Sequence, residues 1–246
     1  MAANNLHPHP LVRKLDSICI LTQNERDALV SLPMQVQDIR AHQDVVREGD
    51  RPSRSFLLME GFAFSFKLTG EGKRQITAFH ILGDMPDLQS LHLRTLDTSV
   101  GTITACKVGF VQHESLRELC ARFAGITNAF WRQTLIDAAT FREWTTNIGQ
   151  REAYSRVAHV LCELMARMRA VGLVQDHTCE FPITQNELAD ATGMSTVHVN
   201  RTVQELRRAG LIVLKGSTLQ VLDWDRLRQA GDFDPNYLHL EHPQAA

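Results

Sequence analysis

Residues 195–204 carry side chains suited to reading nucleic acid. A helix that enters the major groove presents the outward side chains of its first turns to base edges and phosphates. Arg201 can donate two hydrogen bonds to guanine, Asn200 can pair with adenine, and Val197 can contact a thymine methyl group. The alternative role for Asn200 and Thr196 is a phosphate contact, which positions a protein without reading sequence. The candidate DNA-contacting residues are Gln185, Ser195, Thr196, Val197, His198, Asn200, Arg201 and Gln204.

The local sequence indicates how these side chains would be held. Thr184 and Glu187 have the spacing of a capping box, in which each side chain binds a backbone N–H at a helix start. Gly193 can adopt the left-handed conformation that ends this helix, and Ser195 can cap the next one. The second helix has an inward stripe made of Val199, Thr202, Val203 and Leu206. The pattern predicts a helix-turn-helix, and the alternative is two core helices of another α-helical domain.

Two short alternating segments follow Gly210 and favour a β-hairpin. LIVLK and TLQVL flank Gly216-Ser217, a two-residue loop suited to a tight turn. A hairpin after a helix-turn-helix is a wing, and the combination favours DNA binding over the two-helix alternative. Asp223 can cap a last short helix that Gly231 ends, and we expect the tail FDPNYLHL to be ordered and folded back on the wing. We assign 149–223 to a winged helix-turn-helix domain and 224–246 to a C-terminal extension.

Residues 124–148 are predicted to form one long helix with apolar side chains on more than one face. From about Ala124 to Asn147 there is no proline, and no glycine after Gly125. An apolar surface wider than one stripe requires a second partner. That partner is either the same helix of a second subunit or the core of a larger single domain, and this segment alone favours neither. The residues assigned to a dimer interface are Phe130, Trp131, Leu135, Ala138 and Phe141.

Residues 11–123 are predicted to form a β-rich domain preceded by short helices. Thr22 and Glu25 have capping-box spacing. Between Val36 and Val111, short β-rich runs alternate with glycine and charged turns, which is typical of a barrel or sandwich. FAFSFKL and QITAF, joined by a glycine-rich turn, predict one of its hairpins. The fold class is therefore α+β, with an N-terminal jelly-roll β-barrel, a long dimerisation helix and a C-terminal winged helix-turn-helix domain.

Composition and charge limit the classes of protein. The formal net charge is −2, so contact with DNA must come from a local patch. The five cysteines are scattered, odd in number and without a CxxC pair, which suits a reducing compartment. We find neither a signal peptide nor an apolar run long enough for a membrane span, and we expect a cytoplasmic protein. HExxH, GxSxG, GxGxxG and Walker motifs are absent, so no enzymatic activity is expected.

The order of these segments resembles the Crp/Fnr family of bacterial regulators over nearly the whole chain. The resemblance is carried by REGD around Gly49, by Gly61, by Gly83-Asp84 and, most specifically, by ITQNELADATGMSTVHVNRTVQELRRAGLI. It implies a cyclic-nucleotide-binding-like domain and a homodimer that binds a palindromic site on double-stranded DNA and regulates transcription through RNA polymerase. In that family an arginine of the recognition helix reads guanine, and Arg201 matches it. A glutamate that accepts from cytosine is replaced here by Val197, so we expect a different half-site.

The same resemblance implies an effector site, which this sequence matches less well. Cyclic-AMP-binding members use a Gly-Glu pair and a later Arg-Ser pair around the phosphate. The corresponding candidates here are Gly83, Asp84, Arg94 and Thr95. A second alignment, counted back from Ala105-Cys106, places Leu96-Asp97 at the later pair, where the aspartate would repel a phosphate. We expect an effector other than cyclic AMP, or none.

Other sensing chemistries find few ligands in this sequence. Iron-sulfur members use a tight N-terminal cysteine cluster, and only Cys19 lies near that end. The candidate haem ligands are His7, His9, His80 and His92. Cys106 and Cys120 could sense oxidants, although buried structural thiols are more common. We assign no haem, iron-sulfur or metal site. The alternatives to this regulator are a cyclic-AMP-responsive regulator and a cyclic-nucleotide-binding module that acts on a protein partner.

Overall fold

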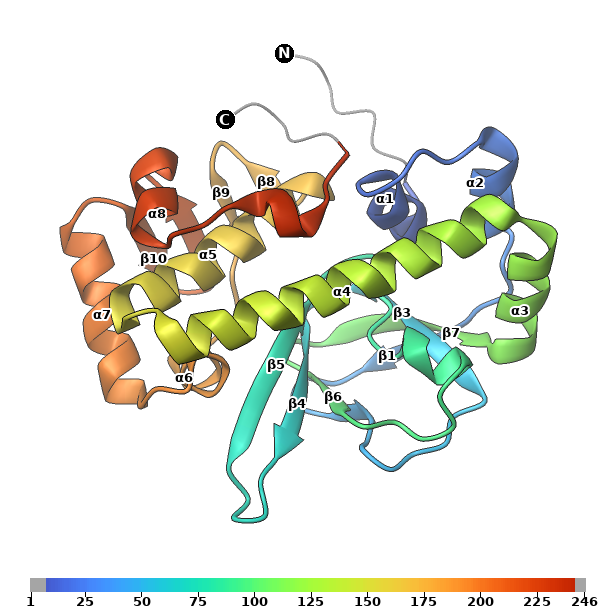
Figure 1. Ribbon diagram of the computed structural model, residues 1–246, viewed down its shortest axis with the longest axis horizontal. Coiled ribbons are helices and arrows are strands. Elements are labelled where there is room, and N and C mark those ends of the chain that lie inside the picture. Colours follow the sequence, from blue (N-terminus) through green and yellow to red (C-terminus); the bar gives the residue numbers. More distant parts are fainter. Residues whose placement is uncertain (1–7, 242–246) are drawn as a thin grey trace.

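The computed structural model describes residues 8–241, which are arranged around one long helix (Figure 1). That helix, α4 (Ala124–Gln150), runs along the length of the molecule. Residues 8–123, which we call the N-terminal domain, lie against its first part, and residues 153–231, the C-terminal domain, lie at its other end. The α+β fold class expected from the sequence is confirmed. Within residues 8–241, none of the helices has the length and apolarity needed to cross a bilayer.

Two antiparallel sheets form the body of the N-terminal domain. One has the strand order β1-β7-β3 and the other the order β2-β6-β4-β5. Their strands are β1 (Gln35–Ile39), β2 (Asp44–Val46), β3 (Arg54–Glu60), β4 (Ala63–Leu68), β5 (Arg74–His80), β6 (Ser99–Thr102) and β7 (Cys106–Gln112). Phe56, Val100 and Val108 come from both sheets and are fully buried in one cluster. The hairpin predicted from FAFSFKL and QITAF is confirmed as β4–β5.

Short helices cover the ends of these sheets. They are α1 (Pro10–Asp16), α2 (Gln23–Val30), the 3-10 helix η1 (Leu88–Leu91) and α3 (His113–Arg122). The predicted capping box of Thr22 and Glu25 is present at the start of α2. Helix α1 lies directly over Gly83, whose φ is +90°, and a Cβ on Gly83 would stand 2.6 Å from the Cβ of Lys14. Only glycine fits there, so Gly83 is needed for the packing of α1.

Helix α4 has two different apolar faces, as its sequence predicts. One face is buried in the core of the N-terminal domain and includes Ile126, Ala129, Phe130 and Ile136. The other face is open to solvent and presents Trp131, Leu135 and Phe141, which are 69%, 55% and 46% exposed. Phe130 is only 6% exposed, because it fills the core together with side chains of α1, and this corrects its assignment to a dimer interface. Ala138 is half-buried.

The C-terminal domain begins after a break in the helix at Arg151 and Glu152. Its elements are α5 (Ala153–Ala170), β8 (Val174–Gln175), β9 (Thr178–Glu180), α6 (Gln185–Thr192), α7 (Thr196–Arg208), β10 (Ile212–Lys215), β11 (Thr218–Val221) and α8 (Trp224–Ala230). The predicted wing is confirmed, because β10 and β11 pair around Gly216-Ser217. A second hairpin, β8–β9, extends it to a sheet of order β10-β11-β9-β8. Strands β8 and β9 were not predicted, because they are too short to show an alternating pattern.

The tail FDPNYLHL, residues 233–240 of the C-terminal extension, packs on α4 and α5, which corrects the expectation that it folds back on the wing. Its 3-10 helix η2 (Pro235–Leu238) packs against α4 and α5. Phe233 and Leu238 are 5% and 2% exposed, and both belong to the core cluster that contains α5. Packing on α4 and α5 removes these apolar side chains from water, and this burial favours the observed position.

The two domains also touch directly. Phe79 of β5 belongs to the same buried cluster as Leu164 and Met168 of α5. Its ring lies edge to face with that of Trp144 of α4, with the centroids 5.8 Å apart. Helix α6 lies on β5, where Arg74 forms an ion pair of 2.7 Å with Asp190. Movement of the C-terminal domain would therefore break contacts with the β4–β5 hairpin.

Candidate nucleic-acid interface and effector cavity

Helices α6 and α7 form the predicted helix-turn-helix. The Glu187 carboxylate accepts a hydrogen bond of 2.7 Å from the N–H of Thr184, and the Thr184 hydroxyl accepts one from the N–H of Glu187. Gly193 ends α6 in the left-handed region, with φ +66°, and the Ser195 hydroxyl caps α7. Val199, Thr202, Val203 and Leu206 are buried, which confirms the inward stripe of α7. The two helices are thus locked in one relative orientation.

The outward side of the first turns of α7 is exposed. Val197 is 77% exposed, and Asn200 and Arg201 are exposed beside it. The Thr196 hydroxyl donates to Asn186 Oδ1 at 2.8 Å, and Asn200 Nδ2 donates to Gln185 Oε1 at 2.8 Å. These bonds tie the outward residues of α7 to the start of α6. The polar groups are therefore oriented before any ligand arrives, which favours specific recognition.

The other predicted contact residues are less available to DNA, because their side chains are half-buried or already hydrogen-bonded. The Ser195 hydroxyl is engaged in capping α7, because it accepts from the N–H of His198 at 3.3 Å. His198 and Gln204 are half-buried, and Arg207 donates to Gln204 Oε1 at 3.4 Å. Exposed arginines nevertheless follow the helix, namely Arg201, Arg207 and Arg208. They supply a local positive patch in a chain whose net charge is −2.

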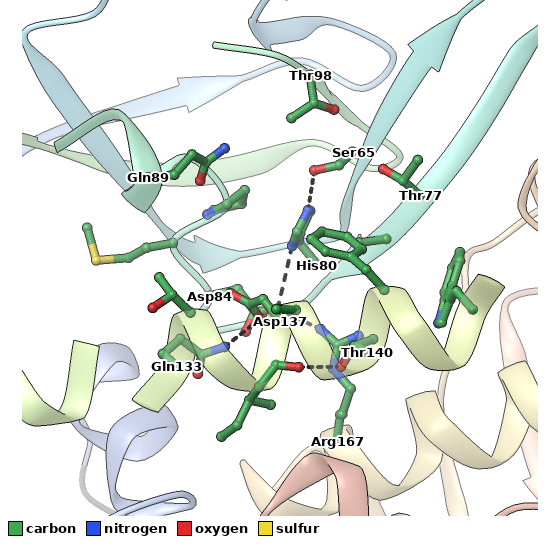
Figure 2. Close-up of a pocket in the computed structure, with 18 of the residues that line it drawn as sticks. Ser65, Thr77, His80, Asp84, Gln89, Thr98, Gln133, Asp137, Thr140 and Arg167 are labelled. Carbon is green, nitrogen blue, oxygen red and sulfur yellow. Dashed lines mark hydrogen bonds and ion pairs between the residues drawn. The ribbon is translucent and has the colours of Figure 1, made fainter. Parts of the chain in front are cut away.

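A cavity of about 600 Å³ lies between the N-terminal domain and α4 (Figure 2). Its walls come from β4, β5, the segment after Asp84, one side of α4, α5 and the C-terminal extension. The polar side chains that line it include Ser65, His80, Gln89, Thr98, Gln133, Asp137 and Thr140. Phe141 and Trp144 of α4 line it as well. Its size and mixed lining suit a small organic ligand.

Asp84 is a buried carboxylate at this cavity that joins segments distant in the sequence (Figure 2). Lys14 Nζ lies 2.9 Å from Asp84 Oδ1, and Arg167 Nη2 lies 2.9 Å from Oδ2. The N–H of Ile81 also donates to Oδ2 at 2.9 Å. Burial raises the pKa of Asp84, but Lys14 and Arg167 outweigh it and hold that pKa well below its ordinary value. Asp84 therefore stays ionised and links α1, β5 and α5.

A second buried carboxylate, Glu163 of α5, continues this network. Its side chain is completely buried. Arg167 Nη1 donates to Glu163 Oε1 at 3.2 Å, and Trp144 Nε1 and the Tyr237 hydroxyl each donate to Oε2 at 2.8 Å. Three donors satisfy the charge, as a buried carboxylate requires. A continuous polar chain thus runs from α1 through Asp84 and α5 to the C-terminal extension.

Two family models match the two domains. The Crp-like helix-turn-helix domain matches residues 155–230, which contain α6, α7 and the wing, and the cyclic nucleotide-binding domain matches residues 36–123. The chain belongs to the Crp/Fnr family of transcriptional regulators. The resemblance drawn from the sequence is confirmed.

This Crp/Fnr regulator is similar to its relatives over most of its length. It is 23% identical to the transcriptional activator protein anr of Pseudomonas aeruginosa over 203 residues, which cover 82% of this chain and 83% of that protein. It is 20% identical to the fumarate and nitrate reduction regulatory protein of Escherichia coli over 221 residues, or 87% of each chain. The solved structure of FixK2 from Bradyrhizobium japonicum matches with a TM-score of 0.73 and 22% identity, covering 81% of this chain and 98% of that one. That likeness shows a shared fold.

The cavity of this Crp/Fnr regulator does not fit a cyclic phosphate. Gly83 is covered by α1, and Arg94 and Thr95 are exposed and lie outside the cavity lining, so these three effector assignments are corrected. Asp97 lines the cavity instead, as the second alignment implies. The cations of the lining are each paired with a carboxylate, Lys14 and Arg167 with Asp84 and Lys67 with Glu48. Within the described residues, no cation of the lining is left to pair with an entering phosphate, and the carboxylates of the lining would repel it.

The candidate haem and thiol residues are not brought together. His80 lies at the cavity, 2.7 Å from the Ser65 hydroxyl, whereas His92 is exposed and outside the lining. His7 lies outside the described residues. In the part of the chain that the structure describes, no group of three or more His, Cys, Asp or Glu residues is arranged to hold a metal ion. Burial raises the pKa of the Cys106 and Cys120 thiols, which keeps them protonated and poorly reactive.

His80 makes the stability of this regulator depend on pH. Burial, helped by Arg167 and Lys14, lowers the pKa of His80 to about 4, although Asp84 opposes the shift. Between about pH 6.5 and 4 the unfolded chain binds this proton more readily, so the stabilising effect of neutral His80 is lost as pH falls. We expect the wild type to lose up to about 1.4 kcal/mol per pH unit relative to His80→Asn in this window. Urea unfolding of both proteins between pH 7 and 4.5 measures this, and parallel pH profiles would contradict it.

Sequence reasoning missed several residues of the polar chain, namely Lys14, Trp144, Glu163 and Arg167. A weak signal exists for two of them. Lys14 lies among the apolar residues of α1, and Arg167 falls on the inward stripe of α5. Because charged residues are rarely buried without a partner, these positions indicate that each side chain has one. Their partner Asp84 lies far from both in sequence, so pattern analysis could not connect them.

Proposed function

We propose that this protein is a homodimeric regulator that reads a palindromic DNA site through α7. The observation that carries the proposal is the exposed row of Val197, Asn200 and Arg201 at the start of α7. Hydrogen bonds from Thr196 and Asn200 to α6 hold this part of the helix in place. These are the positions from which a recognition helix contacts base edges. Relatives named as transcriptional activators support a role in transcription, and we propose that the protein acts in the cytoplasm through contact with RNA polymerase.

Helix α4 is the proposed dimer interface. Trp131, Leu135 and Phe141 form an exposed apolar strip along it, which a second copy of the same helix would cover. A two-fold pair of subunits would present two copies of α7, one to each half of a palindromic site.

The proposed effector is a small molecule other than cyclic AMP that binds in the cavity beside α4. The paired cations and the position of Asp97 support this choice. Because α4 lines the cavity and also carries the exposed apolar strip, a ligand there could change how two subunits pack. Such a change would alter the spacing of the two recognition helices.

Selection of double-stranded DNA from a random pool tests this function. The purified protein is incubated with the pool at fixed salt, with and without cyclic AMP. An enriched two-fold palindrome that does not depend on cyclic AMP is the expected result. Enrichment only with cyclic AMP would support a cyclic-AMP-responsive regulator. No enrichment under either condition would overturn the proposal in favour of a module that acts on a protein partner.

Substitutions on α4 test the dimer. We expect Trp131→Asp combined with Leu135→Asp to weaken dimerisation by roughly a thousandfold, because central apolar anchors contribute about 2 kcal/mol or more each. Sedimentation equilibrium of both proteins measures the change. Leu68→Asp is the matched control, because Leu68 and Leu135 are 56% and 55% exposed but Leu68 lies on β4. Equal dissociation constants for the double variant and the control would contradict the interface.

A further inference from the structure

The segment Asp232–Glu241, which we call the strap, follows the last residue that the helix-turn-helix family model matches, residue 230. It leaves α8, passes along α5 and α4, and ends beside α1 (Figure 1). The strap therefore begins in one domain and ends on the other.

The first part of the strap is anchored in the C-terminal domain. Phe233 is 5% exposed, and its ring lies edge to face with the rings of His159 and Trp224, at centroid distances of 5.3 Å and 6.2 Å. The Tyr237 hydroxyl donates to buried Glu163 and lies 3.2 Å from His159 Nε2. This part cannot leave without opening the core around α5.

The end of the strap is fixed to the N-terminal domain and to α4. The backbone N–H of Glu241 donates to the carbonyl of Ser17 at 3.0 Å. Arg132 of α4 forms an ion pair of 2.9 Å with the Glu241 carboxylate and donates to the carbonyl of His239 at 3.3 Å. Leu240 packs against the core clusters of both domains. These contacts close a ring that runs from α1 through Asp84, α5 and the strap back to α1.

The ring borders the cavity. Lys14, Asp84 and Arg167 belong to the cavity lining, and so do Leu238 and Leu240 of the strap. We propose that the strap is a wall of the effector site and that it ties the position of the C-terminal domain to what fills the cavity. This inference rests on the proposed function, because it takes the cavity to be the effector site. A ligand shifts a conformational equilibrium only through contacts that differ between two states. The strap supplies such contacts, since it is covalently part of the C-terminal domain.

Two truncations test the strap. Deletion of residues 240–246 removes Leu240 and Glu241 but keeps Phe233, Tyr237 and Leu238, and deletion of residues 242–246 is the matched control. We expect the longer deletion to speed hydrogen exchange of the backbone amides of α1 and of residues 147–153 by about tenfold. We also expect it to change the dissociation constant for the selected DNA site by about fivefold or more. The control should match the full chain in both measurements.

Two further variants keep the test decisive if the deletion disturbs folding. Leu240→Trp places a larger side chain in the wall of the cavity and should shift DNA affinity in the same direction as the deletion. This measurement can be made before the effector is known. Arg132→Glu breaks the ion pair with Glu241, and the charge swap of Arg132→Glu with Glu241→Arg should restore the wild-type values.

Some outcomes would overturn the strap and others the proposed function. If hydrogen exchange becomes faster but DNA affinity is unchanged, the strap only stabilises the structure. If neither measurement changes, the strap has neither a structural role nor a role in DNA binding. If neither the full chain nor the control binds DNA, the proposed function fails. Hydrogen exchange then still decides whether the strap joins the domains.

Discussion

Asp84→Ala is expected to lower the free energy of unfolding by about 3 to 5 kcal/mol, because it removes the carboxylate that pairs with two buried cations. Lys14 and Arg167 both lie 2.9 Å from this carboxylate, and the side chains of both are about one tenth exposed. Arg167 keeps a second partner in Glu163, so the larger part of the cost falls on Lys14. Urea unfolding at pH 7, followed by circular dichroism, measures the change.

Two further variants separate charge from volume at this position. Asp84→Asn keeps the shape of the side chain but not its charge, so we expect it to lose nearly as much stability as Asp84→Ala. Asp97→Ala is the matched control, because Asp97 also lines the cavity but is exposed. Its effect should stay within about 0.5 kcal/mol, as for most surface substitutions. If Asp84→Asn behaves like this control, the ion pairs do not stabilise the fold.

Arg201→Ala is expected to weaken binding to the selected DNA site by roughly 100-fold or more, because the dimer loses one bidentate base contact, of about 1 to 3 kcal/mol, in each half of the palindrome. The physical reason is that Arg201 is exposed at the start of α7, where it can reach a guanine. Repeating the DNA selection with the variant should give a palindrome that is degenerate at one position in each half. Fluorescence anisotropy with labelled DNA measures the affinity.

Arg201→Lys distinguishes base reading from phosphate contact. Lysine keeps the positive charge but lacks the planar pair of donors, so it should restore little of the specificity. If Arg201 instead contacts phosphate, Arg201→Lys should bind almost normally. In Arg201→Ala the slope of log K against log salt concentration would then become shallower by about two, one for each subunit of the dimer, with no change in the preferred sequence.

The elements with local signals could be predicted from the sequence. Capping boxes at Thr22 and Thr184, the glycine at 193 and the two-residue loop at Gly216-Ser217 fix helix ends and a turn through neighbouring residues alone. The short strands β8 and β9 could not be predicted, because β9 pairs with β11 of the wing and β8 pairs in turn with β9. The tail was misplaced for the same reason, since its partners on α4 and α5 lie far away in the sequence.

The residues of the effector cavity could not be assigned from the sequence either, because their partners lie far away along the chain. Gly83 and Asp84 do matter, but for packing under α1 and for ion pairing. The family pattern suggested ligand binding because it records which residues occur together and not which partners surround them in this chain. Arg167 reaches Asp84 from the other domain, and only the three-dimensional arrangement reveals that contact.

The ion pairs of Asp84 also bear on the order in which the chain folds during synthesis. Lys14 and Asp84 leave the ribosome well before Arg167, so the N-terminal domain first forms with only one of the two cations beside its buried aspartate. Its final stability arrives when α5 has been made and has docked. A chain that stops before residue 167 would therefore lack both the helix-turn-helix and one of the two cations that stabilise the buried aspartate of its N-terminal domain.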